Sequence, residues 1–174
     1  MRIYLIRHAE AVAKNEAATD EDRGLTEIGR EQAQALAAAL SVRGIDLGAI
    51  ISSPYVRAHQ TATELAEILK PTLPDVIASN LLTPERVRPR KLSKFLAELG
   101  MDNVAIVGHM PELGAYAEWL IGARDGSLPL AKAAAVCVEF DDAPAKGEGE
   151  LMWLVTPEWF VSPVKAASRA TAGA

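Results

Sequence analysis

Two arginines and two histidines stand directly after short apolar runs of this sequence. Arg7 and His8 follow the first run, Arg57 lies one helical turn past the second, and His109 follows the run at 104–107. Forked guanidinium donors match phosphate oxygens two at a time, and the amides of helices that begin nearby add positive potential. A carboxylate ligand would need fewer donors. The four residues therefore indicate a binding site for a phosphate dianion.

The apolar runs alternate with helical patterns along the chain. Residues 3–6, 49–52 and 104–107 predict strands, and residues 75–79 predict a weaker one. Each strand is followed by apolar residues at helical spacing, which predict four helices with one buried face each. The buried faces are Ala33, Leu36, Ala37 and Leu40; Ala62, Leu65, Ala66 and Leu69; Leu92, Phe95, Leu96 and Leu99; and Leu113, Tyr116, Ala117, Leu120 and Ile121.

Serine, proline and glycine mark the ends of these helices. Ser53 predicts the N-cap of the second helix, with Pro54 as its first residue. Gly100 predicts the end of the third helix, and Pro111 the start of the fourth.

The order of elements predicts an α/β fold of three layers, α/β/α, around a mostly parallel central sheet. Two late strands, at 133–140 and 150–156, are joined by a hairpin loop at 141–149 and add an antiparallel edge. In open sheets of this kind, the loops at the carboxyl ends of the strands form the ligand crevice. We therefore expect the two arginines and the two histidines to meet at one edge of the sheet.

Length, charge and cysteine content narrow the function further. The chain has 174 residues, the size of one domain, and we expect that domain over residues 1–160 with a C-terminal tail at 161–174. A formal net charge of −5 disfavours general binding to nucleic acid or to anionic membranes. One cysteine allows neither an internal disulfide nor a thiolate cluster for zinc. Since no apolar stretch is long enough for a signal peptide or a membrane span, a cytoplasmic protein is expected.

Alternative readings of single residues are weaker than the combined pattern. An isolated arginine at a strand end is usually a surface residue, and an isolated histidine is usually a cap, but here four such residues share equivalent positions. A metal site built from His8, Glu10 and His109 is disfavoured because the arginines would repel a cation, so no metal or other cofactor is expected.

His59 lies about 200° around the helix from Arg57 and should face away from the crevice. Cys137 sits in an alternating strand and reads as a core residue.

The sequence resembles the histidine phosphatase superfamily, which has the phosphoglycerate-mutase-like fold. The resemblance spans roughly residues 1–157 and is carried by four ordered motifs: Leu5-Ile6-Arg7-His8-Ala9-Glu10, Leu25-Thr26-x-x-Gly29-x-x-Gln32-Ala33, Ser53-Pro54-x-x-Arg57-Ala58-x-Gln60-Thr61-Ala62 and Val107-Gly108-His109-x-Pro111. It implies that His8 is the phosphorylated nucleophile and that Arg7, Arg57 and His109 hold the phosphoryl oxygens. Ala9 departs from the family's pattern, which has glycine there. Alanine would restrict the backbone if this position required a positive φ.

The implied reaction is in-line phosphoryl transfer to His8 followed by hydrolysis. His8 must be neutral to attack, and two nearby guanidinium groups favour that form. Its other ring nitrogen needs an acceptor, most simply a backbone carbonyl. Arg7, Arg57 and a protonated His109 are expected to balance charge in the transition state, without a metal.

The acid that would protonate a leaving group is left open by the sequence. Relatives place an acidic residue after the third strand, which makes Glu85 the candidate by position, with Glu10 and Glu112 as rivals. An imidazole leaving group needs this acid least, because its own pKa lies near neutrality.

The short connection between the second and fourth strands predicts an open site, which suits a phosphorylated side chain on another protein. The layout is most similar to the SixA-type phosphohistidine phosphatases, which implies a partner of the histidine phosphotransfer type. Two alternatives stay open: a phosphomonoesterase of the same fold that acts on a small phosphorylated metabolite, and a catalytically silent module that binds phosphoproteins.

Overall fold

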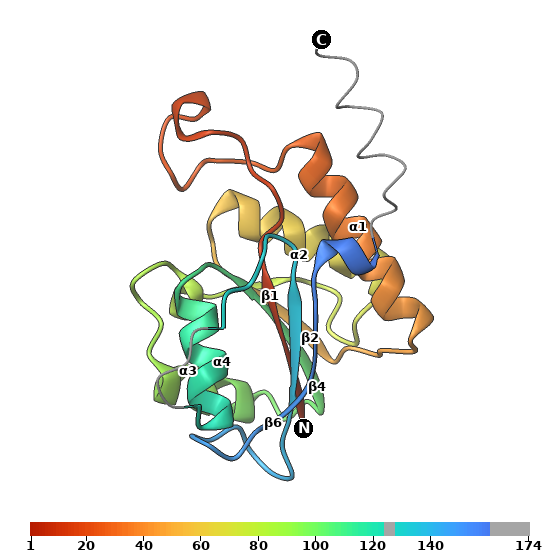
Figure 1. The fold of residues 1–174 in the computed structure, drawn as a ribbon, viewed down its shortest axis with the longest axis vertical. Coiled ribbons are helices and arrows are strands. Elements are labelled where there is room, and N and C mark those ends of the chain that lie inside the picture. The colour runs from red at the N-terminus through yellow and green to blue at the C-terminus, as the bar shows by residue number, and fades with distance from the viewer. Residues whose placement is uncertain (124–127, 161–174) are drawn as a thin grey trace.

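The computed structural model describes residues 1–123 and 128–160. Their strands form one six-stranded sheet in the order β3-β2-β4-β1-β5-β6 (Figure 1). The strands are β1 Arg2–Arg7, β2 Ala49–Ser52, β3 Ile77–Ala78, β4 Asn103–Gly108, β5 Ala135–Glu139 and β6 Glu150–Val155. The first four in that order run parallel, β5 is antiparallel to β1, and β6 is antiparallel to β5. The predicted mostly parallel sheet with an antiparallel edge hairpin is confirmed.

Four α-helices cover the two faces of the sheet. They are α1 Glu27–Val42, α2 Val56–Leu69, α3 Pro89–Glu98 and α4 Glu112–Ile121, with short 3₁₀ turns η1 Lys14–Glu16, η2 Asn80–Leu82 and η3 Pro157–Trp159. The helices α1 and α2 share one buried cluster with the sheet, and α3 and α4 share the other. The three-layer α/β/α architecture is therefore confirmed.

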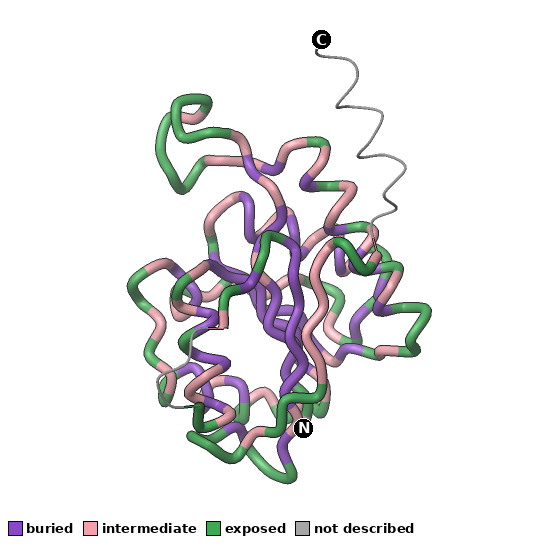
Figure 2. The backbone as a smooth tube through the Cα atoms, viewed as in Figure 1, coloured by how far each residue is buried: buried purple, intermediate pink, exposed green. Residues whose placement is uncertain are grey.

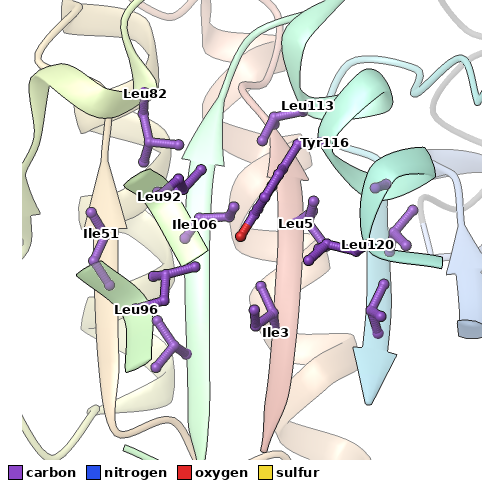
Figure 3. Packing of buried hydrophobic residues seen from close by; sticks show 14 of the residues in the cluster. Ile3, Leu5, Ile51, Leu82, Leu92, Leu96, Ile106, Leu113, Tyr116 and Leu120 are labelled. Carbon is purple, nitrogen blue, oxygen red and sulfur yellow. The ribbon is translucent and has the colours of Figure 1, made fainter. Parts of the chain in front are cut away.

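The alternation of side chains along β1 explains the two clusters. Ile3 and Leu5 face α3 and α4, whereas Tyr4 and Ile6 face α1 and α2. Figure 3 shows the first cluster filling the layer between the sheet and its helices. Each fully buried leucine or isoleucine stabilises the fold by about 1.5–3 kcal/mol. The position of the site residues at the end of β1 is thus fixed by packing on both sides of that strand.

The predicted N-cap of α2 is wrong. The helix begins at Val56 after Tyr55, and no side chain of the described residues caps it. Ser53 instead continues the ladder of β2, since its backbone N donates to Val107 O at 2.9 Å. Its hydroxyl contacts the site described below and accepts a hydrogen bond of 3.3 Å from Tyr55 N, so it closes the turn before the helix and does not cap the helix itself.

Three predicted strands are longer than the strands observed. The third strand is confined to Ile77–Ala78 rather than 75–79, and the last ends at Val155. Ala133, the predicted start of the fifth strand, has a left-handed φ of 58° and its N–H points at the carbonyls that end β1. A residue in that conformation cannot belong to an extended strand, so β5 begins at Ala135.

The distribution of burial follows the layers (Figure 2). The strands β1, β2, β4 and β5 are mostly buried, whereas the edge strands β3 and β6 are partly exposed, and the long connection from β1 to α1 has an exposed tip. Within the described part of the chain, no helix is long and apolar enough to cross a membrane. The predicted tail at 161–174 lies outside the described residues.

Candidate active site

The ends of β1, β2 and β4 bring three chain segments into one row. These strands are neighbours in the order β2-β4-β1. Beyond the ladder, His8 N donates to Gly108 O at 3.0 Å on one side of β4, and Ser53 N donates to Val107 O at 2.9 Å on the other. His8, Ser53 and His109 are therefore held at the same edge by backbone hydrogen bonds, which is where the sequence places the ligand crevice.

His8 is buried, with 8% of its surface exposed, and both ring nitrogens have partners. Nδ1 lies 2.8 Å from the carbonyl oxygen of Ala9, and Nε2 accepts a hydrogen bond from Arg57 Nε at 3.2 Å. A carbonyl can only accept, so the proton is on Nδ1 and the lone pair is on Nε2. The backbone acceptor that the sequence could not identify is thus Ala9 O. Nε2 is the ring atom available to attack an electrophile.

Burial is the main reason that the pKa of His8 falls from 6.5 to about 4. The charges of Arg57 and Arg7 lower it further, whereas the hydrogen bond to Ala9 raises it. His8 is consequently neutral across the physiological range, as its expected role requires.

Arg57 is almost fully buried and is held by a loop residue that the sequence analysis missed. Its Nη1 donates to Asp20 O at 2.5 Å and its Nη2 to Asp20 Oδ2 at 3.0 Å. Arg23 binds the other oxygen of the same carboxylate at 2.9 Å, and with Arg57 it lowers the pKa of Asp20. A guanidinium has five N–H donors, and the bonds to His8 and Asp20 use three. Two donors remain for an oxyanion.

His109 packs beside His8, with ring centroids 5.1 Å apart. Its Nε2 lies 2.9 Å from Ser53 Oγ, and the ring meets the edge of Tyr55 at 5.2 Å. Burial, followed by the charges of His8 and Arg57, lowers the pKa of His109 to about 3. Without a bound anion, His109 is therefore neutral near pH 7, because the ring shares a buried, cationic environment with the arginines. The expectation of a protonated His109 concerns the transition state, in which a bound phosphoryl group adds negative charge.

Two buried polar atoms at this edge have no hydrogen-bond partner among the described residues: Arg7 Nε and His109 Nδ1. Arg7 is otherwise positioned by a hydrogen bond of 2.7 Å from its Nη1 to Leu130 O. An unpaired buried donor costs about 1–3 kcal/mol. An oxyanion bound between Arg7 and Arg57 would relieve that cost, which supports an anion site.

The three candidate acids have different environments. Glu10 accepts a hydrogen bond from Thr26 Oγ1 at 3.1 Å and so braces the N-cap of α1. The Glu85 side chain is exposed, and its backbone N donates to Glu112 Oε1 at 2.8 Å. Glu112 Oε2 is buried and has no hydrogen-bond partner in the described part of the chain. Of the three carboxylates, Glu112 is thus the one with a buried free oxygen near the start of α4.

Several motif residues serve to shape the backbone around His8. Gln32 Oε1 accepts from Glu10 N at 3.0 Å, and Thr61 Oγ1 accepts from Ala9 N at 3.1 Å. A Cβ on Gly29 would lie 2.0 Å from Glu10 O, so only glycine fits there. Gln32, Thr61 and Gly29 therefore position the backbone that follows His8, which explains their presence in the motifs.

Ala9 fits the position where glycine was expected. Its φ is not in the positive region, and its methyl group is fully buried. The backbone geometry therefore does not require glycine, and the departure from the family's pattern is accommodated.

The residues set aside in the sequence analysis lie away from this edge. His59 lines a separate hollow with Thr63 and Asp75. Cys137 is buried in the cluster under α1 and α2, and burial raises the pKa of its thiol to about 11. Residues 1–123 and 128–160 contain no group of three or more His, Cys, Asp or Glu side chains that could hold a metal ion.

The pKa of His8 gives a prediction that is independent of any substrate. In a ¹⁵N NMR titration, the His8 ring should keep the shifts of the neutral Nδ1–H tautomer from pH 7 down to about pH 5 and titrate near 4. The unfolded chain binds a proton near pH 6.5 and the folded chain does not, so the free energy of unfolding should fall as the pH drops from 6.5 towards 4. Titration of His8 near 6.5 would contradict this geometry.

Comparison with known proteins gives consistent matches over nearly the whole chain. The sequence profile of the histidine phosphatase superfamily (branch 1) matches residues 3–81. An uncharacterized protein of Picosynechococcus sp. is 32% identical over 171 residues, covering 92% of this chain and 99% of its own. The phosphohistidine phosphatase SixA of Escherichia coli K12 is 25% identical over 160 residues, covering 90% and 94%. A solved structure of the protein histidine phosphatase SixA complexed with tungstate superposes with a TM-score of 0.78 at 25% identity, covering 90% and 97%.

Proposed function

The chain belongs to the histidine phosphatase superfamily and is a phosphatase, and we propose that it removes the phosphoryl group from phosphohistidine on a partner protein through a covalent intermediate on His8. The observation that carries the proposal is the hydrogen bonding of His8. Ala9 O fixes the proton on Nδ1, and Nε2 points its lone pair at the cationic groups that would hold a phosphoryl oxygen.

Phosphoryl transfer to His8 follows from this arrangement. Nε2 forms a bond to phosphorus as the P–N bond to the substrate imidazole breaks, and Arg57 Nε turns from Nε2 to a phosphoryl oxygen. The proton stays on Nδ1, so the phosphorylated ring is an imidazolium that the Ala9 carbonyl stabilises. Arg7 and Arg57 balance the charge on the equatorial oxygens, and His109 contacts the same group.

Hydrolysis completes the cycle. Water attacks phosphorus, the P–N bond to His8 breaks, and orthophosphate leaves as H2PO4⁻ with both protons of the water. Nδ1 again keeps its proton, which returns His8 to the tautomer seen in the structure. No residue other than His8 has to change its covalent state.

The environments of the three acids support a phosphohistidine substrate. A phosphohistidine whose second nitrogen is protonated releases a neutral imidazole, which needs no acid, whereas a phosphomonoester releases an alkoxide, which does. Glu10 is committed to Thr26, and the Glu85 carboxylate is exposed. SixA of E. coli carries phosphohistidine phosphatase in its name, and tungstate, an oxyanion like phosphate, is bound in the solved SixA structure.

One observation favours the second candidate, a phosphomonoesterase for small metabolites. Glu112 has a buried oxygen that no described residue hydrogen-bonds, and it follows His109 by three residues. A carboxyl group in that place could protonate an alkoxide. In that case, activity on esters would depend on Glu112 rather than on Glu85.

Paired substrates distinguish the two functions. We expect kcat/KM for a phosphorylated histidine phosphotransfer protein to exceed that for an alkyl phosphomonoester such as glycerol 2-phosphate by about 100-fold or more, in the presence of a chelator. Glu85→Gln and Glu112→Gln should leave the first activity within about twofold of wild type, because imidazole leaves without an acid. Equal kcat/KM values for the two substrates, or loss of the first activity in either variant, would rule out the phosphohistidine proposal.

A further inference from the structure

A cluster of cations on the connection from β3 and on α3 has no role in the site described above. Residues 86–94 hold five cationic side chains and no carboxylate, in a chain whose formal net charge is −5. All five are exposed, and together they are called the basic strip: Arg86, Arg88, Arg90, Lys91 and Lys94. Without them, the formal net charge would be −10.

The fold does not use most of these charges. Lys94 has an exposed ion pair of 3.7 Å with Glu98, and Arg88 Nη1 donates to two nearby carbonyls. The side chains of Arg86, Arg90 and Lys91 have no hydrogen bond or ion pair within the described residues.

Two of the cations are placed against the dipole of their own helix. Arg90 and Lys91 occupy the first turn of α3, which contains no acidic residue. A cation near a helix N-terminus is unfavourable, by about 0.3–1 kcal/mol for each charge. Helix stability therefore does not account for these residues.

The basic strip begins where the connection from β3 borders the site. Ser79 N donates to Ser52 O at 2.8 Å, next to the serine that contacts His109. At the other end of the same connection, Glu85 N donates to Glu112, at the start of α4. Arg86 is the next residue, and it lines a shallow hollow of about 430 Å³ with Arg88 and Lys91. A partner that presents a phosphoryl group to His8 would lie against this connection.

We infer that the basic strip docks an acidic surface next to the phosphohistidine of the partner protein. The inference rests on the proposed function and assigns the part of the enzyme surface that recognises the partner. A local cationic surface on an acidic enzyme steers an acidic partner to the site and raises the association rate, with a strong dependence on salt. A nucleic acid fits less well, because the remaining surface repels a long polyanion.

Charge reversal with a matched control tests the inference. The triple variant Arg86→Glu, Arg90→Glu and Lys91→Glu changes only exposed side chains that have no hydrogen bond or ion pair to another described residue. The control, Arg43→Glu, Lys70→Glu and Lys146→Glu, makes the same change in net charge on exposed residues of other elements. Both proteins are assayed with a phosphorylated histidine phosphotransfer protein and with the small substrate phosphoimidazole.

At about 0.01 M ionic strength, where charges act over ~30 Å, the strip variant should lose about tenfold or more in kcat/KM for the protein substrate relative to the control. The loss should appear in KM, should largely disappear at about 1 M salt, and should be absent with phosphoimidazole. Equal loss in strip variant and control would overturn the inference, as would a fall with phosphoimidazole or strip-dependent binding of a DNA oligonucleotide with unchanged protein kinetics. Failure of the wild type on the protein substrate, with phosphoimidazole still hydrolysed, would instead overturn the proposed function and the inference together.

Discussion

Replacing His8 with alanine is expected to lower kcat by about 10⁴-fold or more with any phosphorylated substrate. His8 Nε2 is the atom that would bond to phosphorus, and the burial that keeps it neutral also excludes other nucleophiles from that place. His8→Gln retains a side chain of similar length but has no ring nitrogen to phosphorylate, so it should lose as much. Initial rates of phosphate release measure the effect.

The matched control for this variant is His59→Ala. His59 lies in a separate hollow on the same helix as Arg57, so its removal should change kcat by less than about twofold. If His8→Ala kept more than about a tenth of the wild-type rate, His8 could not be the nucleophile.

Replacing Arg57 with alanine is expected to lower kcat/KM by about 10³-fold. Arg57 is the only described side chain that donates to His8, and two of its N–H donors are left for a phosphoryl oxygen. Arg57→Lys keeps the charge but loses the planar fork and the Nε donor, so it should recover no more than about tenfold of the loss. Steady-state kinetics on both variants measure these effects.

Arg23→Lys is the control for the Arg57 variants. Arg23 shares the Asp20 carboxylate with Arg57 but makes no contact with His8. A fall of less than about tenfold is expected for it. A comparable loss in Arg23→Lys and Arg57→Lys would mean that the loop around Asp20, and not the Arg57 fork, determines the rate.

Apolar patterning predicts the layers of this fold because burial on both faces leaves a clear signal. The run at 3–6 is apolar throughout, as expected for a central parallel strand covered by helices on both sides. The boundaries are harder to predict, since they depend on tertiary hydrogen bonds. Ser53 has the sequence of an N-cap but extends β2, because its backbone N donates to Val107 O, and its hydroxyl contacts His109 and closes the turn at Tyr55.

The meeting of His8, Arg57 and His109 could be predicted because equivalent strand ends share one edge of a sheet. The hydrogen bonds that orient these side chains and set their protonation could not be predicted from the sequence. Asp20 reaches Arg57 across 37 residues from a polar loop without periodicity, and a carbonyl such as Ala9 O leaves no mark in a sequence. The neutral state of His109 depends on burial beside the arginines, which only the folded structure defines.

The most direct test of the central claim is to identify the atom that carries the phosphoryl group. Wild-type enzyme is mixed with ³²P-labelled phosphohistidine protein, quenched in base during the first turnover, and digested for peptide sequencing and ³¹P NMR. We predict a base-stable, acid-labile label on Nε2 of His8, because Nδ1 is held by the Ala9 carbonyl. Label on Nδ1, label on another residue, or turnover with no labelled enzyme at any time would contradict the account.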